Sequence, residues 1–392
     1  MEPKIRFKGF EGEWKAPLFS EMVERISASG QAGMLPGVEF EDIASGEGCF
    51  NKNIYQKECH KYGKLFYEGD ILFGKLRPYL KNIILADFNG VAIGDFWVLR
   101  SKGLDEKYLY TLVNSESFLK VANISSGSKM PRADWNLVST TKFVVPSAKD
   151  EQKAIGKYFT SLDSQISAST SRLASLKQMK AASLQAMFPQ EGETVPKIRF
   201  KGFEGEWKKV KLSEILTERH ENSTITDSLP QLSFTIADGV IRPEDRKSNK
   251  RDFLIKDIDN KRYLVTKVGD IIYNPANVVY GAIHRNSLMN GVVSPIYKIF
   301  TTMQDSNFIE CAVRRPSFIT KLAMCTEGTV TKLKTLKPEA FLNMEVCITP
   351  SLEEQKLIGN YFTSLDRQIS LQSQRLEKLK QIKSACLEKM FV

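Results

Sequence analysis

The sequence has few of the residues that build metal centres or disulfide frameworks. Its 392 residues include three histidines and six cysteines, and no two cysteines stand in a C-x-x-C pair. A zinc site needs several such ligands at short spacing, so we expect no metal site. Scattered cysteines in a chain with an ordinary core indicate a reducing compartment rather than a disulfide scaffold.

Long apolar runs are also missing. No stretch approaches the ~18 apolar residues that a membrane-spanning helix requires, and the start of the chain contains no apolar signal-peptide core. We therefore expect a cytoplasmic protein. Lysine and arginine number 56 against 46 aspartate and glutamate, and the resulting net charge of +10 favours a polyanionic partner.

Signatures of catalysis are incomplete. Residues 69–75 have the glycine and lysine spacing of a P-loop, but Leu76 stands where magnesium binding requires serine or threonine. Residues 274–277 (NPAN) lack the second proline and the aromatic residue of the adenine methyltransferase motif. No carboxylate pair with a nearby lysine indicates a nuclease site. We predict a chain without catalytic residues, without a bound cofactor and without a metal.

The most informative feature of the chain is that it repeats itself. The thirteen residues PKIRFKGFEGEWK occur at 3–15 and again, unchanged, at 196–208. Residues 151–188 recur as 354–391, with 24 of 38 positions identical. The inserts between these segments, 16–150 and 209–353, hardly resemble each other. The chain therefore carries two copies of one frame around two different inserts.

The longer repeated segments predict two long helices. Their apolar residues alternate at spacings of four and three, which is a heptad seam, and neither segment contains an internal proline. Such a helix needs a partner for its apolar stripe, and the other copy is the obvious one. Polar residues interrupt the seam at Ser169, Lys180, Gln372 and Lys383, where they can set the register. The predicted seam residues are Phe159, Leu162, Ile166, Leu173, Leu176, Phe362, Leu365, Ile369, Leu376 and Leu379.

The two inserts predict the same mixed fold. Residues 65–73 predict a turn at Glu68-Gly69 followed by an apolar strand, and 262–273 match them. Residues 90–100 and 291–300 form a second matched β-rich pair. A helical stretch follows in each insert, at 106–121 and 306–324. Each insert is then expected to close on a strand that ends in proline, at 143–146 and 346–350.

Each insert also contains two loops that suit nucleic acid. Arginine and lysine suit guanine, asparagine suits adenine, and small hydroxyl residues beside glycine let backbone amides approach a phosphate. Ordinary solvated loops would look similar one at a time, but here they occur as matched pairs in a basic protein. The residues predicted to bind DNA are Lys75, Arg77, Tyr79, Lys81, Ser126, Ser128, Lys129, Arg132, Asn274, Asn277, Tyr280, His284, Arg285, Thr329, Thr331, Lys332 and Lys334.

Taken together, these features resemble the specificity (S) subunit of type I restriction–modification systems. The resemblance covers the whole chain. The residues that carry it are the segments around Trp14 and Trp207, the Gly-Asp-Ile strands at 69–71 and 269–271, and the junctions Pro146…Glu151-Gln152 and Pro350…Glu354-Gln355 that lead into the helices.

The resemblance implies a function without catalysis. In that family two target recognition domains each read one half of a bipartite DNA sequence, and two helices packed as an antiparallel coiled coil hold them apart. The S subunit assembles with two methyltransferase (M) subunits that carry S-adenosylmethionine and methylate adenine. Restriction (R) subunits add an ATP-dependent nuclease, so ATP and magnesium are implied for the partners.

We therefore predict an α+β fold with a pseudo-twofold internal repeat. The predicted parts are 1–150 (first target recognition domain), 151–188 (long helix), 189–195 (linker), 196–353 (second domain) and 354–392 (C-terminal long helix). Because the inserts differ, the two DNA half-sites should differ as well.

Two other functions fit parts of the pattern. A fused or degenerate methyltransferase or endonuclease could read DNA with the same domains, but it would need catalytic motifs that the chain lacks. A scaffold that binds no DNA would fit the repeated frame, yet it gives the divergent basic loops no purpose.

Overall fold

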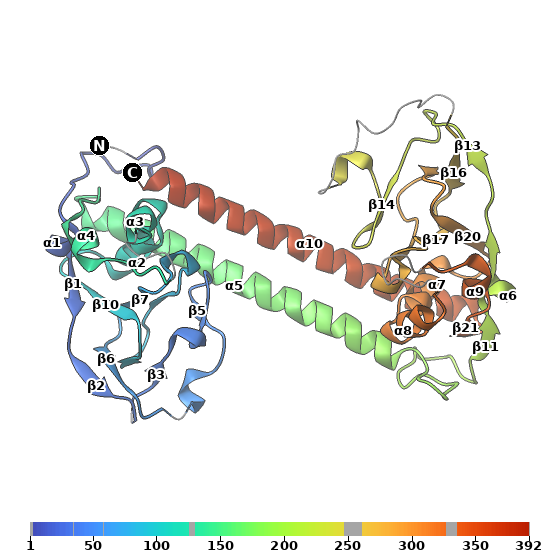
Figure 1. Ribbon diagram of the computed structural model, residues 1–392, viewed down its shortest axis with the longest axis horizontal. Helices are drawn as coiled ribbons and strands as arrows, with labels where there is room; N and C mark the ends of the chain where they lie inside the picture. Colours follow the sequence, from blue (N-terminus) through green and yellow to red (C-terminus); the bar gives the residue numbers. More distant parts are fainter. Residues whose placement is uncertain are drawn as a thin grey trace. The chain divides into compact units, whose positions relative to one another are not determined.

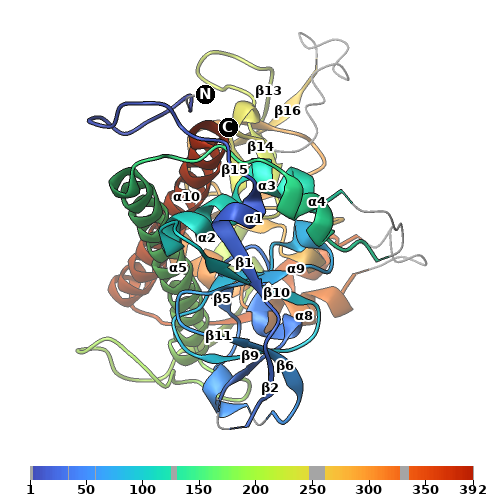
Figure 2. The ribbon, with the colours of Figure 1, turned by 90° about the vertical axis from the view of Figure 1, so that its left-hand side faces the viewer.

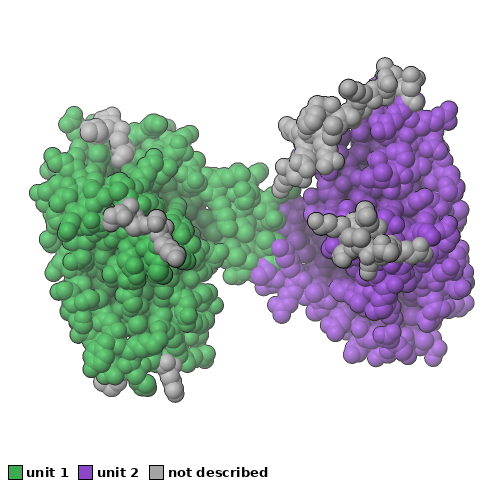
Figure 3. Space-filling model, viewed as in Figure 1, with its two compact units in different colours: residues 1–173, 372–392 green, residues 174–371 purple. Residues whose placement is uncertain are grey.

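The computed structural model describes residues 3–33, 35–57, 59–124, 130–246, 261–326 and 335–391. The chain divides into two compact units (Figure 3): unit 1 is Met1–Leu173 with Gln372–Val392, and unit 2 is Ala174–Leu371. The division runs through the two long helices, α5 (Lys149–Ala186) and α10 (Leu352–Met390), so each unit contains one end of each helix. The domain bounds expected from the sequence stay a prediction.

Unit 1 is built around two four-stranded sheets in which most neighbouring strands are antiparallel. The first has the order β1-β10-β7-β8 and the second β2-β6-β9-β3. Helices α2, α3 and α4 gather at one end of the unit, and β2, β6 and β9 at the other (Figures 1 and 2). The elements are α1 (Phe19–Met22), β1 (Val23–Ile26), β2 (Ser29–Gln31), β3 (Gly37–Val38), β4 (Ile43–Ala44), β5 (Cys49–Phe50), β6 (Tyr62–Phe66), β7 (Ile71–Gly74), β8 (Ile83–Leu85), β9 (Gly90–Ala92), β10 (Phe96–Ser101), α2 (Glu106–Asn114), α3 (Glu116–Ala122) and α4 (Trp135–Thr140).

Unit 2 repeats this plan. Its four-stranded sheet has the order β12-β20-β17-β18, which matches β1-β10-β7-β8 strand for strand, and β13-β16-β19 match β2-β6-β9. The elements are β11 (Lys208–Lys211), α6 (Leu212–Ile215), β12 (Leu216–Glu218), β13 (Asn222–Ser223), β14 (Ser233–Thr235), β15 (Gly239–Ile241), β16 (Tyr263–Thr266), β17 (Ile271–Tyr273), β18 (Ile283–Arg285), β19 (Gly291–Val293), β20 (Lys298–Thr302), α7 (Ser306–Val313), α8 (Pro316–Met324), α9 (Pro338–Leu342) and β21 (Glu345–Ile348). The prediction that the divergent inserts share one fold is confirmed.

The matched Gly-Asp-Ile segments explain part of this agreement. In each unit the glycine has a positive φ, +87° at Gly69 and +97° at Gly269, which a residue with a side chain rarely adopts. The aspartate that follows is buried and pairs with an arginine of a neighbouring strand or strand end: Asp70 with Arg100 at 2.6 Å and Asp270 with Arg219 at 2.8 Å. The same turn therefore leads from one sheet into the other in both units, from β6 to β7 and from β16 to β17.

The central strands of each unit are covered on both faces. Ile71 and Phe73 of β7 pack into the core beneath the helices, whereas Leu72 between them packs into a second apolar cluster on the opposite face. In unit 2, Ile271 and Tyr273 face one cluster and Ile272 faces another. Because strand side chains alternate between the faces, a run of apolar residues is what a doubly covered strand requires.

Two sequence predictions need correction. The helical stretches at 106–121 and 306–324 are each two helices, because Ser115 caps a new helix, α3, and Pro316 begins another, α8. Serine and proline at these positions favour a helix start over continuation. The expected strand at 143–146 is only an isolated bridge between Val145 and Lys15, whereas its counterpart, β21, is a strand paired with β11.

Candidate nucleic-acid interface and helix pair

The thirteen-residue segments hold the beginnings of the long helices. Arg6 donates two hydrogen bonds to the carboxylate of Glu151, at 2.7 and 2.8 Å, and Arg199 does the same to Glu354, at 2.6 and 2.9 Å. Both glutamates are buried, with side chains 1% and 0% exposed. The carboxylate of Glu354 raises the pKa of Arg199. This bidentate geometry fixes the segment against the helix in both units.

The Arg6–Glu151 and Arg199–Glu354 pairs, called the Arg–Glu clamps below, differ in one further contact. In unit 1 the indole Nε1 of Trp14 donates to Glu151 at 3.3 Å. In unit 2 the equivalent Trp207 is buried without a hydrogen-bond partner at Nε1 among the described residues, and the hydroxyl of Thr349 donates to Glu354 instead. The two units therefore share the Arg–Glu hydrogen bonds but differ in the uncharged side chain that donates to the glutamate.

The long helices pair along the predicted seam within each unit. All ten predicted seam residues are buried or half-buried. In unit 1, Phe159 and Leu162 of α5 lie in the same core as Leu379 of α10. In unit 2, Leu176 of α5 lies in the same core as Phe362 and Leu365 of α10. The two helices thus form an antiparallel coiled coil. In each unit, seam residues of both helices also pack into the hydrophobic core of that unit.

The polar interruptions of the seam make specific contacts between the helices. Lys383 pairs with Asp163 in unit 1, and Lys180 pairs with Asp366 in unit 2, each at 2.5 Å. The side-chain amide of Gln372 donates to the backbone carbonyl of Ser169 at 3.2 Å. Partly exposed ion pairs add little stability, so their main effect is on register.

The two predicted DNA-binding loops of insert 1 lie side by side. The backbone amide of Arg77 donates to the carbonyl of Pro131 at 2.8 Å, and the amide of Ala133 donates to the carbonyl of Lys75 at 2.9 Å. A β-bridge joins Leu76 to Arg132. Residues separated by more than fifty positions in sequence therefore form one surface.

Asp95, which the sequence analysis missed, organises the charges of this surface. Its carboxylate lies 3.3 Å from Lys75 and 3.0 Å from Arg132. Burial alone would raise the pKa of Asp95, but Arg132 and Lys75 outweigh it and the pKa is lowered. Lys75 and Arg132 thus share one carboxylate within the unit, whereas Arg77 and Lys81 are exposed and pair with no described carboxylate.

The corresponding surface of unit 2 has a different character. The amide of Leu336 donates to the carbonyl of Pro275 at 3.1 Å, so the described residues that follow the second loop contact the first loop. Asn274 uses its side-chain oxygen to accept from the amide of Ala276, Asn277 is half-buried, and Tyr280 is 65% exposed. This surface offers amide and phenol groups where unit 1 offers cations.

Two predicted residues of unit 2 are engaged inside the unit. His284 is 4% exposed, and its Nε2 donates to the carbonyl of Ile236 at 2.8 Å. Arg285 lies 3.6 Å from Glu310. Burial would raise the pKa of Glu310, but His284 and Arg314 lower it, so the carboxylate stays ionised beside these groups. A role of His284 and Arg285 in DNA binding stays a prediction.

Several predicted residues lie outside the described part of the chain. They share one property, which is that they belong to the second loop of each insert. They are Ser126, Ser128, Lys129, Thr329, Thr331, Lys332 and Lys334.

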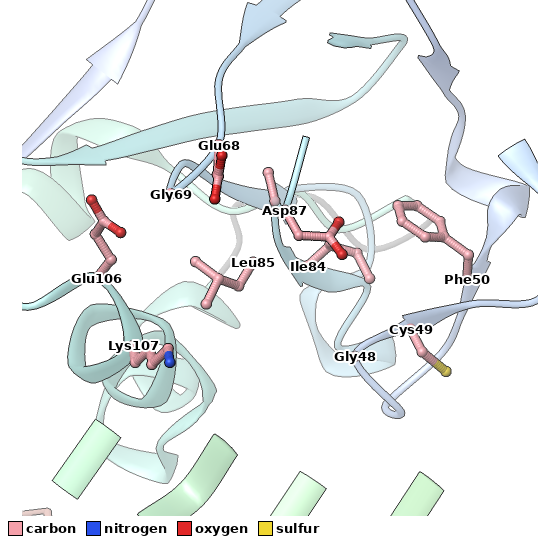
Figure 4. Close-up of a pocket in the computed structure, with 11 residues that line it drawn as sticks. Gly48, Cys49, Phe50, Glu68, Gly69, Ile84, Leu85, Asp87, Glu106 and Lys107 are labelled. Atoms are coloured by element: carbon pink, nitrogen blue, oxygen red, sulfur yellow. The ribbon is translucent and has the colours of Figure 1, made fainter. Parts of the chain in front are cut away.

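A hollow of about 360 Å³ in unit 1 has the wrong charge for a nucleic acid (Figure 4). Glu68 and Glu106 lie on one side of it, and Asp87 also lines it, against a single cation from Lys107. These carboxylates would repel a phosphate group that entered the hollow.

No group of three or more possible metal-ligating side chains occurs within the described ranges. None of the described helices combines the length and apolar character needed to cross a membrane.

Comparison with known proteins agrees with this architecture. Residues 204–381 match a family model described as the type I restriction modification DNA specificity domain. This part of the chain is therefore similar to the specificity subunits of type I restriction–modification systems.

Relatives extend the match beyond that domain. The chain is 24% identical over 307 residues to the type I restriction enzyme MjaVIII specificity subunit of Methanocaldococcus jannaschii, covering 72% of this chain and 69% of that protein. It is 24% identical over 120 residues to the EcoDI specificity subunit of Escherichia coli, covering 29% and 27% of the two chains. The crystal structure of an S subunit from M. genitalium has the same fold, with a TM-score of 0.65, 13% identity and 100% and 99% coverage.

Proposed function

We propose that each unit binds one half of an asymmetric, bipartite DNA target, and that the helix pair acts as the spacer between the half-sites. The observation that carries this proposal is the contrast between frame and loops. Strand order, Gly-Asp-Ile turns and Arg–Glu clamps repeat, whereas the turn after the Gly-Asp-Ile strand offers Arg77 and Lys81 in unit 1 but Asn277 and Gly281 in unit 2. Different donors on the same scaffold select different base edges.

The repeated frame also supports two copies of one partner. Exposed residues of the thirteen-residue segments, such as Lys8 and Lys201, are identical although folding alone does not require it. Two quasi-equivalent surfaces suit two methyltransferase (M) subunits docked on the frame and the exposed helix faces. On this proposal S-adenosylmethionine resides in the M subunits, ATP and magnesium serve the restriction (R) subunits, and this chain holds no cofactor.

The direct test is to express the chain with its cognate M subunits and to map methylated adenines across a genome. The expected result is one asymmetric, bipartite motif whose methylation depends on this chain. Adenine methylation by the chain alone would favour the enzyme alternative. Methylation that does not depend on the chain would favour a scaffold that binds no DNA.

Exchange of one insert should change one half of the motif. Replacing residues 16–150 with the insert of a related protein leaves the second insert and both helices intact. We expect the mapped motif to keep one half unchanged and to acquire a new other half. The reciprocal exchange of residues 209–353 is the matched control. Simultaneous change of both halves would contradict independent reading by the two units.

Shortening both helices by one heptad should change the spacer. Removal of residues 166–172 from α5 and 369–375 from α10 keeps the Lys383–Asp163 and Lys180–Asp366 pairs and removes about 10 Å of helix. That length corresponds to about 3 base pairs of DNA. We expect methylation of the original motif to be lost, as read by the same genome mapping. Deletion from α5 alone misaligns the seam and should prevent assembly. An unchanged spacer after the paired deletion would refute the ruler role.

A further inference from the structure

The turn that follows the Gly-Asp-Ile strand is closed by the same hydrogen bond in both units. The amide of Lys81 donates to the carbonyl of Pro78, and the amide of Gly281 donates to Val278, both at 2.9 Å. These bonds close the short 3₁₀ turns Pro78–Leu80 and Val278–Tyr280. The two turns can therefore be compared position by position, with Lys81 equivalent to Gly281 and Arg77 to Asn277.

The closing position of the turn has a left-handed backbone in both units. Gly281 has φ of +84° there, and Lys81 has φ of +54°. Arg77, at the start of the turn in unit 1, has φ of +50°. Arg77 and Lys81 are the two non-glycine residues with positive φ in the described part of the chain.

This backbone is unfavourable for arginine and lysine. A Cβ atom crowds the following carbonyl group in the left-handed region, and glycine avoids that strain. Arg77 also precedes Pro78, so the right-handed helical alternative is disfavoured by contact with the proline ring. Unit 2 places glycine at the closing position, so the fold of the turn does not require a lysine there.

The two strained residues carry charges that no described residue of the unit pairs with. Within the described ranges, neither the guanidinium of Arg77 nor the ammonium of Lys81 makes an ion pair or a side-chain hydrogen bond, and both residues are exposed. Lys75 and Arg132 on the same surface both pair with Asp95 and share its single negative charge. Strain retained at an exposed, unpaired site indicates a task for the side chains.

We infer that Arg77 is the base-reading residue of unit 1 and that Lys81 is its phosphate contact; this inference rests on the proposed function. The planar guanidinium matches the O6 and N7 acceptors of a guanine in the major groove, and its backbone is fixed by the bond to Pro131 and by the following proline. Lysine presents a single compact charge, which suits a phosphate and carries no sequence information.

The test uses the complex with M subunits and the variants Arg77→Gly and Lys81→Gly. Glycine relieves the strain, so both variants should melt at the wild-type temperature or about 1–4 °C above it. Arg77→Gly should relax the base preference at one position in one half of the methylated motif. Lys81→Gly should weaken binding to a duplex carrying that motif about fivefold or more, equally for all bases, with a salt slope reduced by about 1.

Two further variants complete the design. Gly281→Lys introduces the strained residue into unit 2 and should lower the melting temperature, which checks the strain argument directly. Lys102→Ala is the control. It removes an exposed lysine of unit 1 whose ammonium donates to the carbonyl of Ser20, and it should leave the motif unchanged.

The outcomes separate the inference from the function on which it rests. A wild-type complex with no chain-dependent motif would overturn the proposed function. A wild-type motif that Arg77→Gly leaves unchanged, or weakens equally at every position, would overturn the assignment of Arg77 alone. Unchanged binding and salt dependence in Lys81→Gly would overturn the phosphate contact.

Discussion

Replacement of Phe391 by alanine should destabilise unit 1 by about 3–5 kcal/mol. This residue is 6% exposed although it is next to the end of the chain. Its ring stacks on that of Tyr108, with the ring centroids 5.8 Å apart. The ring of Phe159 in α5 packs against it at a centroid distance of 6.1 Å. Alanine would leave a cavity where the helix pair meets the globular core. Unfolding in urea, followed by circular dichroism, measures the loss.

The repeat supplies a matched variant in unit 2. Phe188 ends the same sequence motif, is fully buried, stacks on Phe308 at 5.3 Å and meets Trp207 edge-on at 5.6 Å. Phe188→Ala should show a loss of similar size. Leu371→Ala, at an exposed position of α10, should change stability by less than about 0.5 kcal/mol. If Phe391→Ala behaved like Leu371→Ala, Phe391 would not be part of the core.

This pair of phenylalanines shows what the sequence could and could not predict. The heptad spacing predicted both helices and their seam, because apolar periodicity is visible in a single sequence. The repeat period, however, assigned residues 151–188 as one element beside the first domain. In the structure Phe159 belongs to the core of unit 1 and Phe188 to the core of unit 2. Which core receives each end of a helix depends on tertiary packing, which periodicity does not encode.

The chemistry of the loops was predicted less completely than the fold. Composition identified polar, basic loops, and in unit 1 the structure brings the two loops together. The pairing of Arg132 with Asp95 joins residues 37 positions apart, and the burial of His284 against Ile236 joins residues 48 apart. Such contacts depend on strand register and turn geometry. Composition therefore did not reveal that Lys75 and Arg132 share the carboxylate of Asp95.

Removal of a clamp carboxylate should have the second large effect. Glu354→Ala leaves Arg199, whose side chain is 13% exposed, without the partner that accepts two of its hydrogen bonds. Breaking a buried ion pair on one side typically costs about 3–5 kcal/mol, and the partial exposure of Arg199 places the expectation near 2–4 kcal/mol. Glu151→Ala should act similarly on unit 1, where Arg6 and Trp14 both donate to that carboxylate.

The neighbouring residue provides the control for the clamp. Glu353 is exposed in the first turn of α10, and Glu353→Ala should change stability by less than about 1 kcal/mol through the helix dipole. Unfolding in urea compares Glu354→Ala with Glu353→Ala, and the double variant Glu354→Ala with Arg199→Ala separates the pair from the lone buried charge. If the double variant were much less stable than Glu354→Ala, the unpaired arginine would not be the source of the loss. The thirteen-residue segment would then be held by its apolar contacts, such as Phe200 against Tyr361, rather than by charge.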